Sequence, residues 1–141
     1  MNPAEKEQQL IARFSIIENL HERLSAVTER ARKLPTLAEA EKIDAHRVQG
    51  CVSRVWLVGS MEGGRCRFQI DADSALVKGL AALLCEVFDD CETREIVHFE
   101  STVLDALRLS ENLSPTRRQG LAQVQRALRA FAAEALAKIH A

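Results

Sequence analysis

The chain has 141 residues, the length of one ordinary domain, and 47% of them are hydrophobic, enough to form a core. Charged residues make up 28% and nearly cancel to a net charge of −1, whereas a nucleic-acid-binding protein is expected to carry a basic stripe. Aromatic residues amount to only 4%, so a base-stacking surface is not expected either. We therefore predict one domain, residues 1–141, with no nucleic-acid partner.

The N-terminus is polar and lacks the apolar core of a signal peptide. The longest apolar run, residues 79–85, is far too short to span a membrane. We therefore expect a soluble, cytoplasmic protein with no membrane partner. In that compartment cysteines are expected to be reduced thiols rather than disulfides, and the chain has four: Cys51, Cys66, Cys85 and Cys91.

Apolar residues recur every three or four positions between Leu10 and Leu34, which is the spacing of one helical face. The segment Ser15-Ile16-Ile17-Glu18 has the form of a capping box, so two helices with a break near Ser15 are predicted. The second helix is expected to end before Pro35. Residues 36–49 are polar and predicted to be mostly loop.

Residues 52–58 are rich in β-branched and aromatic side chains and predict a strand. Gly63-Gly64 predicts a hairpin turn within residues 59–64, and residues 65–70 then alternate between polar and apolar, as a second strand does. Cys66, Phe68 and Ile70 share the apolar face of that strand.

The next predicted element is an almost wholly apolar helix over residues 75–88, capped by Asp73 or Ser74. Short helices are expected from Thr93 and Ser101, and a long one from Ser114-Pro115. Helices, a small antiparallel meander and further helices in this order indicate an α+β domain.

Cys51 differs from the other cysteines because it follows Gly50, which allows a sharp turn, and precedes a strand. Loops on rigid scaffolds often carry reactive groups. Cys66 and Cys85 lie in apolar patterns typical of core thiols, and Cys91 follows two acidic residues that oppose thiolate formation. Position alone leaves open that Cys51 is another packing thiol.

Three blocks of sequence carry a resemblance to a known family. Residues 48–56, VQGCVSRVW, residues 71–80, DADSALVKGL, and residues 113–121, LSPTRRQGL, resemble the SufE-type sulfur acceptors, a family that includes the CsdE-type proteins. Phe14 and Leu34-Pro35 also fall where the family has them. The three blocks keep the family's order and spacing and extend the resemblance over nearly the whole chain.

The resemblance implies a fold like the NifU-type iron–sulfur scaffold, with a three-stranded antiparallel sheet flanked by helices. The third strand is then expected around Ile43 to Val48. It also implies that Cys51 accepts a persulfide sulfur from a pyridoxal-phosphate cysteine desulfurase, SufS-like or CsdA-like, and raises its turnover. The sulfur would pass to an iron–sulfur assembly scaffold. Such a carrier acts with the desulfurase rather than as a stand-alone enzyme, has no cofactor of its own and is a monomer or homodimer.

The supporting residues that the resemblance implies are Gly50 and Arg117 for the acceptor loop. Asp71, Asp73 and Arg117 would take part in partner binding. Each has a structural alternative: Arg117 as a solvated charge or helix-start ion pair, and the two aspartates as turn and N-cap residues. Trp56 is expected in the core.

Metal binding is the main chemical rival, and no metal site is expected. Cysteines and histidines are present, but no C-x-x-C or H-x-x-x-H spacing occurs among them. The histidines are His21, His46, His98 and His140. Two further alternatives to the carrier remain: a docking module that stimulates the desulfurase without accepting sulfur, and a cluster scaffold.

A persulfide is labile, so a carrier benefits from a loop with an inward and an outward position. Gly50 is the residue best suited to allow such a movement of Cys51. The alternative is a glycine that serves one fixed tight turn, and the sequence leaves both open.

Overall fold

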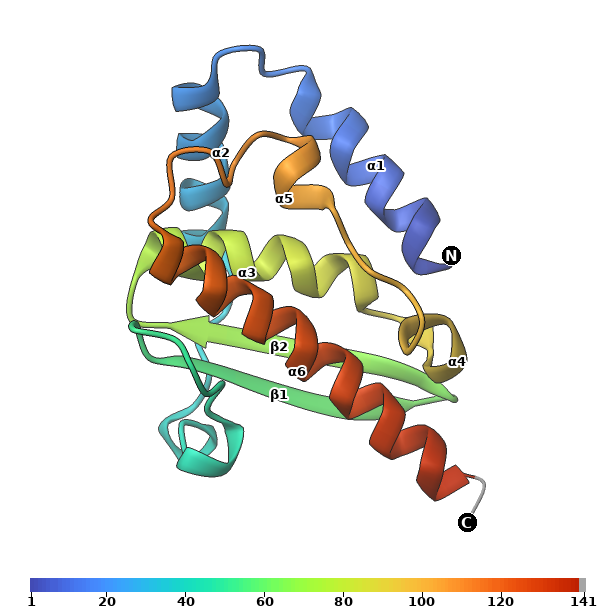
Figure 1. The fold of residues 1–141 in the computed structure, drawn as a ribbon. Helices are drawn as coiled ribbons and strands as arrows, with labels where there is room; N and C mark the ends of the chain where they lie inside the picture. Colours follow the sequence, from blue (N-terminus) through green and yellow to red (C-terminus); the bar gives the residue numbers. More distant parts are fainter. Residues whose placement is uncertain (140–141) are drawn as a thin grey trace.

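The computed structural model describes residues 1–139 (Figure 1). Two helices open the chain, α1 (Pro3–Ser15) and α2 (Leu20–Lys33). The predicted break near Ser15 and the end before Pro35 are confirmed, but the predicted capping box is wrong. The N-cap of α2 is Asn19, whose side chain accepts a hydrogen bond of 3.0 Å from the Glu22 amide. Asn caps a helix as well as Ser does, and Ser15 is still part of α1.

The sheet begins with a long hairpin of β1 (Val55–Glu62) and β2 (Arg65–Ala72). Only Gly63 and Gly64 form its turn, with φ of 57° and 78°, values that glycine adopts readily. The predicted turn therefore started too early, since β1 continues to Glu62. Cys66 and Ile70 are buried on one face of β2, and Arg67 on the other face is exposed, which confirms the predicted alternation.

The third strand does not lie at residues 43–48 as expected. It is β3 (Cys91–Glu92), which pairs with β2 in the strand order β1-β2-β3. The segment 36–48 instead holds two single 3-10 turns, Glu39–Glu41 and Asp44–His46, and contributes one isolated bridge between Arg47 and Trp56. After α3 the chain reverses at Asp90, where φ is 58°, and this reversal brings β3 back alongside β2.

The central helix α3 (Ala75–Phe88) has the predicted bounds and contacts β2, α1, α2 and α6. It lies between the sheet and the first two helices in Figure 1, which explains why almost all of its faces are apolar and buried. The remaining helices are α4 (Thr93–Ile96), α5 (Val103–Ala106) and the long α6 (Pro115–Ile139). The predicted α+β class with a three-stranded antiparallel sheet is confirmed. None of the helices in residues 1–139 has the length and apolarity needed to cross a membrane.

Three of the four cysteines belong to this core. Cys66, Cys85 and Cys91 expose 0%, 5% and 0% of their surface. Burial raises the pKa of all three thiols, that of Cys91 to about 11. At neutral pH these thiols are therefore protonated and packed, as small apolar residues are.

The helix α6 covers the same face of the sheet as α3, and Gly59 in β1 allows it to approach. A Cβ atom at Gly59 would lie 2.6 Å from two ring carbons of Phe131 in α6. The same ring packs edge-on against Phe68 of β2, with ring centroids 5.5 Å apart. This contact fixes how closely α6 lies on the hairpin.

We predict that Gly59→Ala lowers the free energy of unfolding by about 1–3 kcal/mol, because the added methyl group overpacks the Phe131 ring. Urea denaturation followed by circular dichroism measures this change. Ser60→Ala is the matched control, since Ser60 is exposed on the other face of the same strand. Equal stability of the two variants would show that α6 is not held at Gly59.

Candidate functional site

The loop that carries Cys51 joins the 36–48 segment to β1, and its two ends are tied together. The Val48 amide donates a 2.8 Å hydrogen bond to the Val55 carbonyl, which closes the loop over residues 49–54. The Asp73 amide donates to the Arg54 carbonyl at 3.1 Å and holds the loop against the end of β2. The residues between these ties, Cys51 among them, are therefore displayed on a closed base.

Gly50 has φ of +86°, a conformation that other residues adopt only with strain. Its Cα also lies against α6, since a Cβ atom there would come within 3.1 Å of Cγ of Gln123. The predicted sharp turn at Gly50 is thus present. This conformation directs the next residue, Cys51, towards α6.

The Cys51 thiol points at the first turns of α6. Its Sγ atom donates a hydrogen bond of 3.3 Å to the carbonyl oxygen of Gly120. Cys51 is the one cysteine of the chain that is partly exposed rather than buried. It opens onto a cavity of about 290 Å³ with an apolar floor and a polar rim. The lining includes Val77, Leu121 and Val124 in the floor and Ser53, Ser114 and Arg117 at the rim.

Two opposing effects act on the Cys51 thiol. Burial raises its pKa above the ordinary value and is the larger effect, while the charge of Arg47 lowers it. In the isolated protein the protonated thiol therefore predominates at neutral pH. Arg47 was not among the residues singled out in the sequence. The only signal for it was a basic residue four positions before the cysteine, which is too common a pattern to be noticed.

Arg117 lies at the rim of the Cys51 cavity. Its side chain is exposed, and its backbone amide donates to the hydroxyl of Ser114, the residue before α6, at 3.2 Å. The predicted helix start at Ser114-Pro115 is confirmed. Arg117 thus faces both solvent and the cavity, a position from which it can meet a partner.

Asp71 is buried, with 4% of its surface exposed, and its carboxylate has internal partners. It accepts hydrogen bonds from the amides of Leu37 at 3.0 Å and Ala72 at 2.9 Å. Lys78 and Lys42 place ammonium groups 3.2 Å and 3.6 Å from its oxygens. Burial alone would raise the pKa of Asp71, but these hydrogen bonds and Lys78 outweigh it and keep the pKa below its ordinary value. The carboxylate fastens the 36–48 segment to the sheet.

Asp73 is exposed and forms an ion pair of 2.7 Å with Arg54, the last residue of the acceptor loop. The Arg54 guanidinium also lies 5.5 Å from the ring centroid of Trp56, and Lys42 occupies a second position at the same distance. Trp56 itself is buried, as expected. The cap of α3 is Ser74 rather than Asp73, which leaves the Asp73 carboxylate on the surface beside the loop.

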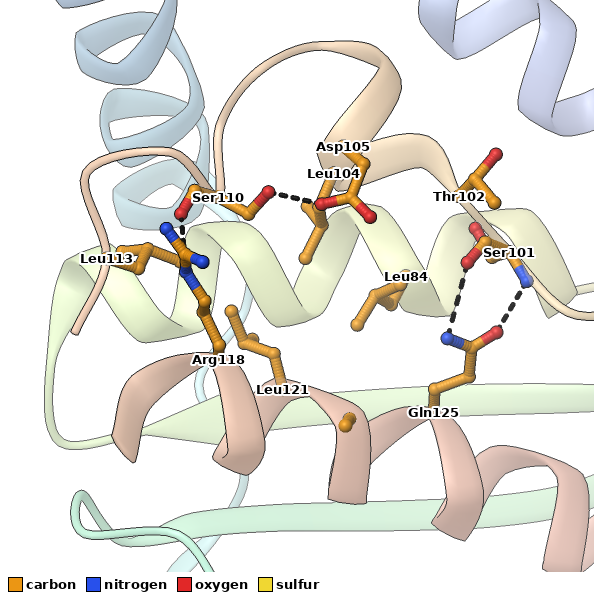
Figure 2. Close-up of a pocket in the computed structure, with 11 residues that line it drawn as sticks. Leu84, Ser101, Thr102, Leu104, Asp105, Ser110, Leu113, Arg118, Leu121 and Gln125 are labelled. Carbon is orange, nitrogen blue, oxygen red and sulfur yellow. Dashed lines mark hydrogen bonds between the residues drawn. The ribbon is translucent and has the colours of Figure 1, made fainter. Parts of the chain in front are cut away.

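A second cavity, of about 320 Å³, lies on the other side of Leu121, between α3, α5 and α6 (Figure 2). Arg118 reaches across it and donates to the carbonyls of Ser110 and Glu111, each at 2.9 Å. Farther along α6, Gln125 accepts from the Ser101 amide at 2.5 Å. These contacts hold the first turns of α6, and hence Gly120, in place. None of the four cysteines lines this cavity.

No three His, Cys, Asp or Glu side chains in residues 1–139 gather into a group that could hold a metal ion. His140, one of the histidines considered above, lies outside the described residues.

The site thus consists of one partly accessible thiol beside a small cavity, between a closed loop and the start of a helix. Cys51, Gly50 and Arg117 come together there, Asp73 lies at the end of the loop, and Asp71 lies inside the molecule. A nucleophilic sulfur with room for one more atom is suited to accept and hold a small group.

Comparisons with known proteins identify the family of the chain. Residues 8–132 match the model of the SufE family, described as an Fe-S metabolism associated domain. The solution structure of a hypothetical protein from Thermus thermophilus is similar in fold, with a TM-score of 0.77 over 97% of this chain and 98% of that chain. The two sequences are 23% identical, so the likeness concerns the fold alone. Because the family match covers most of the chain, the chain belongs to the SufE family, whose domain is associated with iron–sulfur metabolism.

Proposed function

We propose that the protein accepts a persulfide sulfur on Cys51 from a cysteine desulfurase and passes it on towards iron–sulfur cluster assembly. The observation that carries this proposal is the contrast among the four cysteines. Only Cys51 is partly exposed, and its thiol opens onto a cavity, whereas the other three are packed in the core. A cluster scaffold needs several thiolates at one place, so the same contrast favours a carrier over a scaffold.

The transfer is a thiol exchange. The Cys51 thiolate attacks the outer sulfur of the enzyme's persulfide and forms a new S–S bond. The S–S bond of the donor breaks, its electron pair stays on the enzyme's cysteine as a thiolate, and Cys51 becomes the persulfide. Because burial holds the Cys51 pKa high, the isolated protein presents few thiolates. Contact with the desulfurase would then activate Cys51 by moving it out of its half-buried position or by adding positive charge.

The partner would be a SufS-like or CsdA-like desulfurase. Asp73 and Arg117 are exposed charged residues beside the acceptor loop, and we propose that they contact the desulfurase. Asp71 would contribute indirectly, because it holds the strand end from which Asp73 projects. The alternative is a docking module that stimulates the desulfurase without taking sulfur.

The acceptor loop is proposed to have two positions. The inward one has the Cys51 thiol on the Gly120 carbonyl, and the outward one would reach the desulfurase. Gly50 is the residue proposed to allow the change, because glycine adopts its φ of +86° and other backbone conformations without the strain that a side chain brings. The alternative of a fixed turn predicts that Cys51 reacts at the same rate in the free and bound states.

We predict that Cys51→Ser keeps the fold and removes sulfur acceptance together with desulfurase stimulation, because a hydroxyl is a far weaker nucleophile than a thiolate at neutral pH. Sulfide release by a SufS-like desulfurase, with and without the variant, measures this. Cys85→Ala is the control: it should lose about 1–2 kcal/mol of stability through its cavity and keep full stimulation. Undiminished stimulation by Cys51→Ser would leave only the docking module.

We predict that Asp71→Asn and Asp73→Asn separate stability from docking. Asp71→Asn should lower the free energy of unfolding by about 3 kcal/mol at neutral pH, because Lys78 is left buried without its partner. Because folding lowers the pKa of Asp71, its stabilisation is present at neutral pH and lost as the pH falls through the folded pKa. The difference between wild type and Asp71→Asn should therefore shrink in acid.

Asp73→Asn should leave stability within about 0.5 kcal/mol, since the ion pair is exposed. Its effect should appear as a higher dissociation constant for the desulfurase, measured by titration calorimetry. Unchanged affinity would exclude Asp73 from the docking surface.

A further inference from the structure

Gly120 is a glycine that neither the backbone nor the present packing requires. It lies inside α6, where glycine is less favourable than alanine, and its φ is not positive. A Cβ atom at this position would meet Sγ, Cα and Cβ of Cys51 at 3.4, 3.6 and 3.7 Å, which are ordinary contacts. By contrast, a Cβ atom at Gly59 or Gly79 would come within 2.6 or 2.7 Å of its nearest atom. An alanine at 120 would therefore fit against the Cys51 thiol.

The missing side chain leaves space at one particular place. Gly120 lines the 290 Å³ cavity together with Cys51, and the thiol already faces its carbonyl at 3.3 Å. The outer sulfur of a persulfide lies about 2 Å beyond Sγ and needs a place of its own. A methyl group at position 120 would take the part of the cavity next to Sγ.

We propose that Gly120 is a positioning residue whose missing side chain keeps open the space for the outer sulfur of the Cys51 persulfide. This inference rests on the proposed function and adds a residue to it. The thiol form does not need the space, since alanine fits beside it, but the loaded form does. Gly120 therefore affects how long the persulfide sulfur is kept and leaves the unloaded thiol unchanged.

The reaction from which the outer sulfur is shielded in this space is reduction of the persulfide. A dithiol gives its two electrons to the persulfide: the S–S bond of Cys51 breaks, the thiol returns, the outer sulfur leaves as hydrogen sulfide, and the reductant closes to a cyclic disulfide. The attacking thiolate must reach one of the two sulfurs. An outer sulfur lodged beside Gly120 is covered by α6 on that side.

The test compares wild type, Gly120→Ala and Gln119→Ala, the last being an exposed neighbour on α6 that does not line the cavity. Cys51 is loaded chemically. It is first converted to a mixed disulfide with an aromatic thiol. Hydrosulfide then attacks the Cys51 sulfur, forms the persulfide and releases the aromatic thiolate. Loading thus needs no desulfurase. Dithiothreitol is then added, and intact mass and peptide mapping follow the loss of sulfur from Cys51.

For Gly120→Ala we expect the persulfide to be lost about tenfold faster than in wild type, corresponding to about 1.4 kcal/mol. The rate at which a bulky maleimide labels reduced Cys51 should stay within about twofold, since alanine fits beside the thiol. Gln119→Ala should match wild type in both measurements. A purely structural effect of Gly120 would change both rates together.

Equal persulfide lifetimes in Gly120→Ala and wild type would overturn the inference, and so would an increase in maleimide labelling as large as the loss of lifetime. A failure of the proposed function would be recognised by a different measurement. Wild type would then take no sulfur from a desulfurase and cysteine, whatever the lifetimes of the chemically loaded proteins.

Discussion

The close approach of α6 to the first hairpin and to the loop before it determines where the Cys51 thiol lies. Three glycines lie along this contact, and two of them, Gly59 and Gly50, make the close approach possible. Gly59 receives the Phe131 ring, Gly50 lies against Gln123, and Gly120 lies against Cys51. The first two are contacts that an added Cβ atom would disturb, at 2.6 Å and 3.1 Å. A Cβ atom at the third, Gly120, would make an ordinary contact of 3.4 Å with Sγ of Cys51, and its absence leaves space beside that sulfur atom.

The electrostatics of the site follow from the same packing. Bringing Cys51 under α6 buries the thiol partly and raises its pKa, and the charge of Arg47 offsets this only in part. A resting thiol is less reactive towards oxidants than a thiolate, which would suit the proposed carrier between its encounters with a partner. In the proposed transfer, attack on a donor persulfide therefore needs a change at the site, and the partner that we propose to bind at Asp73 and Arg117, both exposed, would bring it about. In the proposed mechanism, protection and activation belong to two states of one loop.

Much of the fold was predictable from the sequence because it depends on local patterns. The spacing of the apolar residues predicted α1 and α2, the almost wholly apolar segment 75–88 predicted α3, and Ser114-Pro115 marked the start of α6. The strand β3 was missed because two residues carry no pattern, and they join β2 only through the reversal at Asp90. The cap at Asn19 was missed because the sequence offered a more familiar motif four residues earlier.

The site was predictable in part. Cys51 was distinguished by the glycine before it and by the resemblance of its surroundings to the SufE family. The burial of Asp71 and the proximity of Arg47 and Gly120 to the thiol depend on contacts between distant segments. No local pattern encodes such contacts, so the resemblance assigned Asp71 to partner binding, with a turn or N-cap role as the alternative, and Arg47 and Gly120 were left unnoticed.

The central claim is that sulfur becomes bound to Cys51. The most direct measurement is the intact mass of the wild-type protein after incubation with a cysteine desulfurase and cysteine, followed by peptide mapping and by reduction as the control. The account predicts a gain of one sulfur atom on the peptide that contains Cys51, which disappears on reduction. Stimulation of the desulfurase without any gain in mass at Cys51, or with the sulfur on Cys66, Cys85 or Cys91, would contradict it.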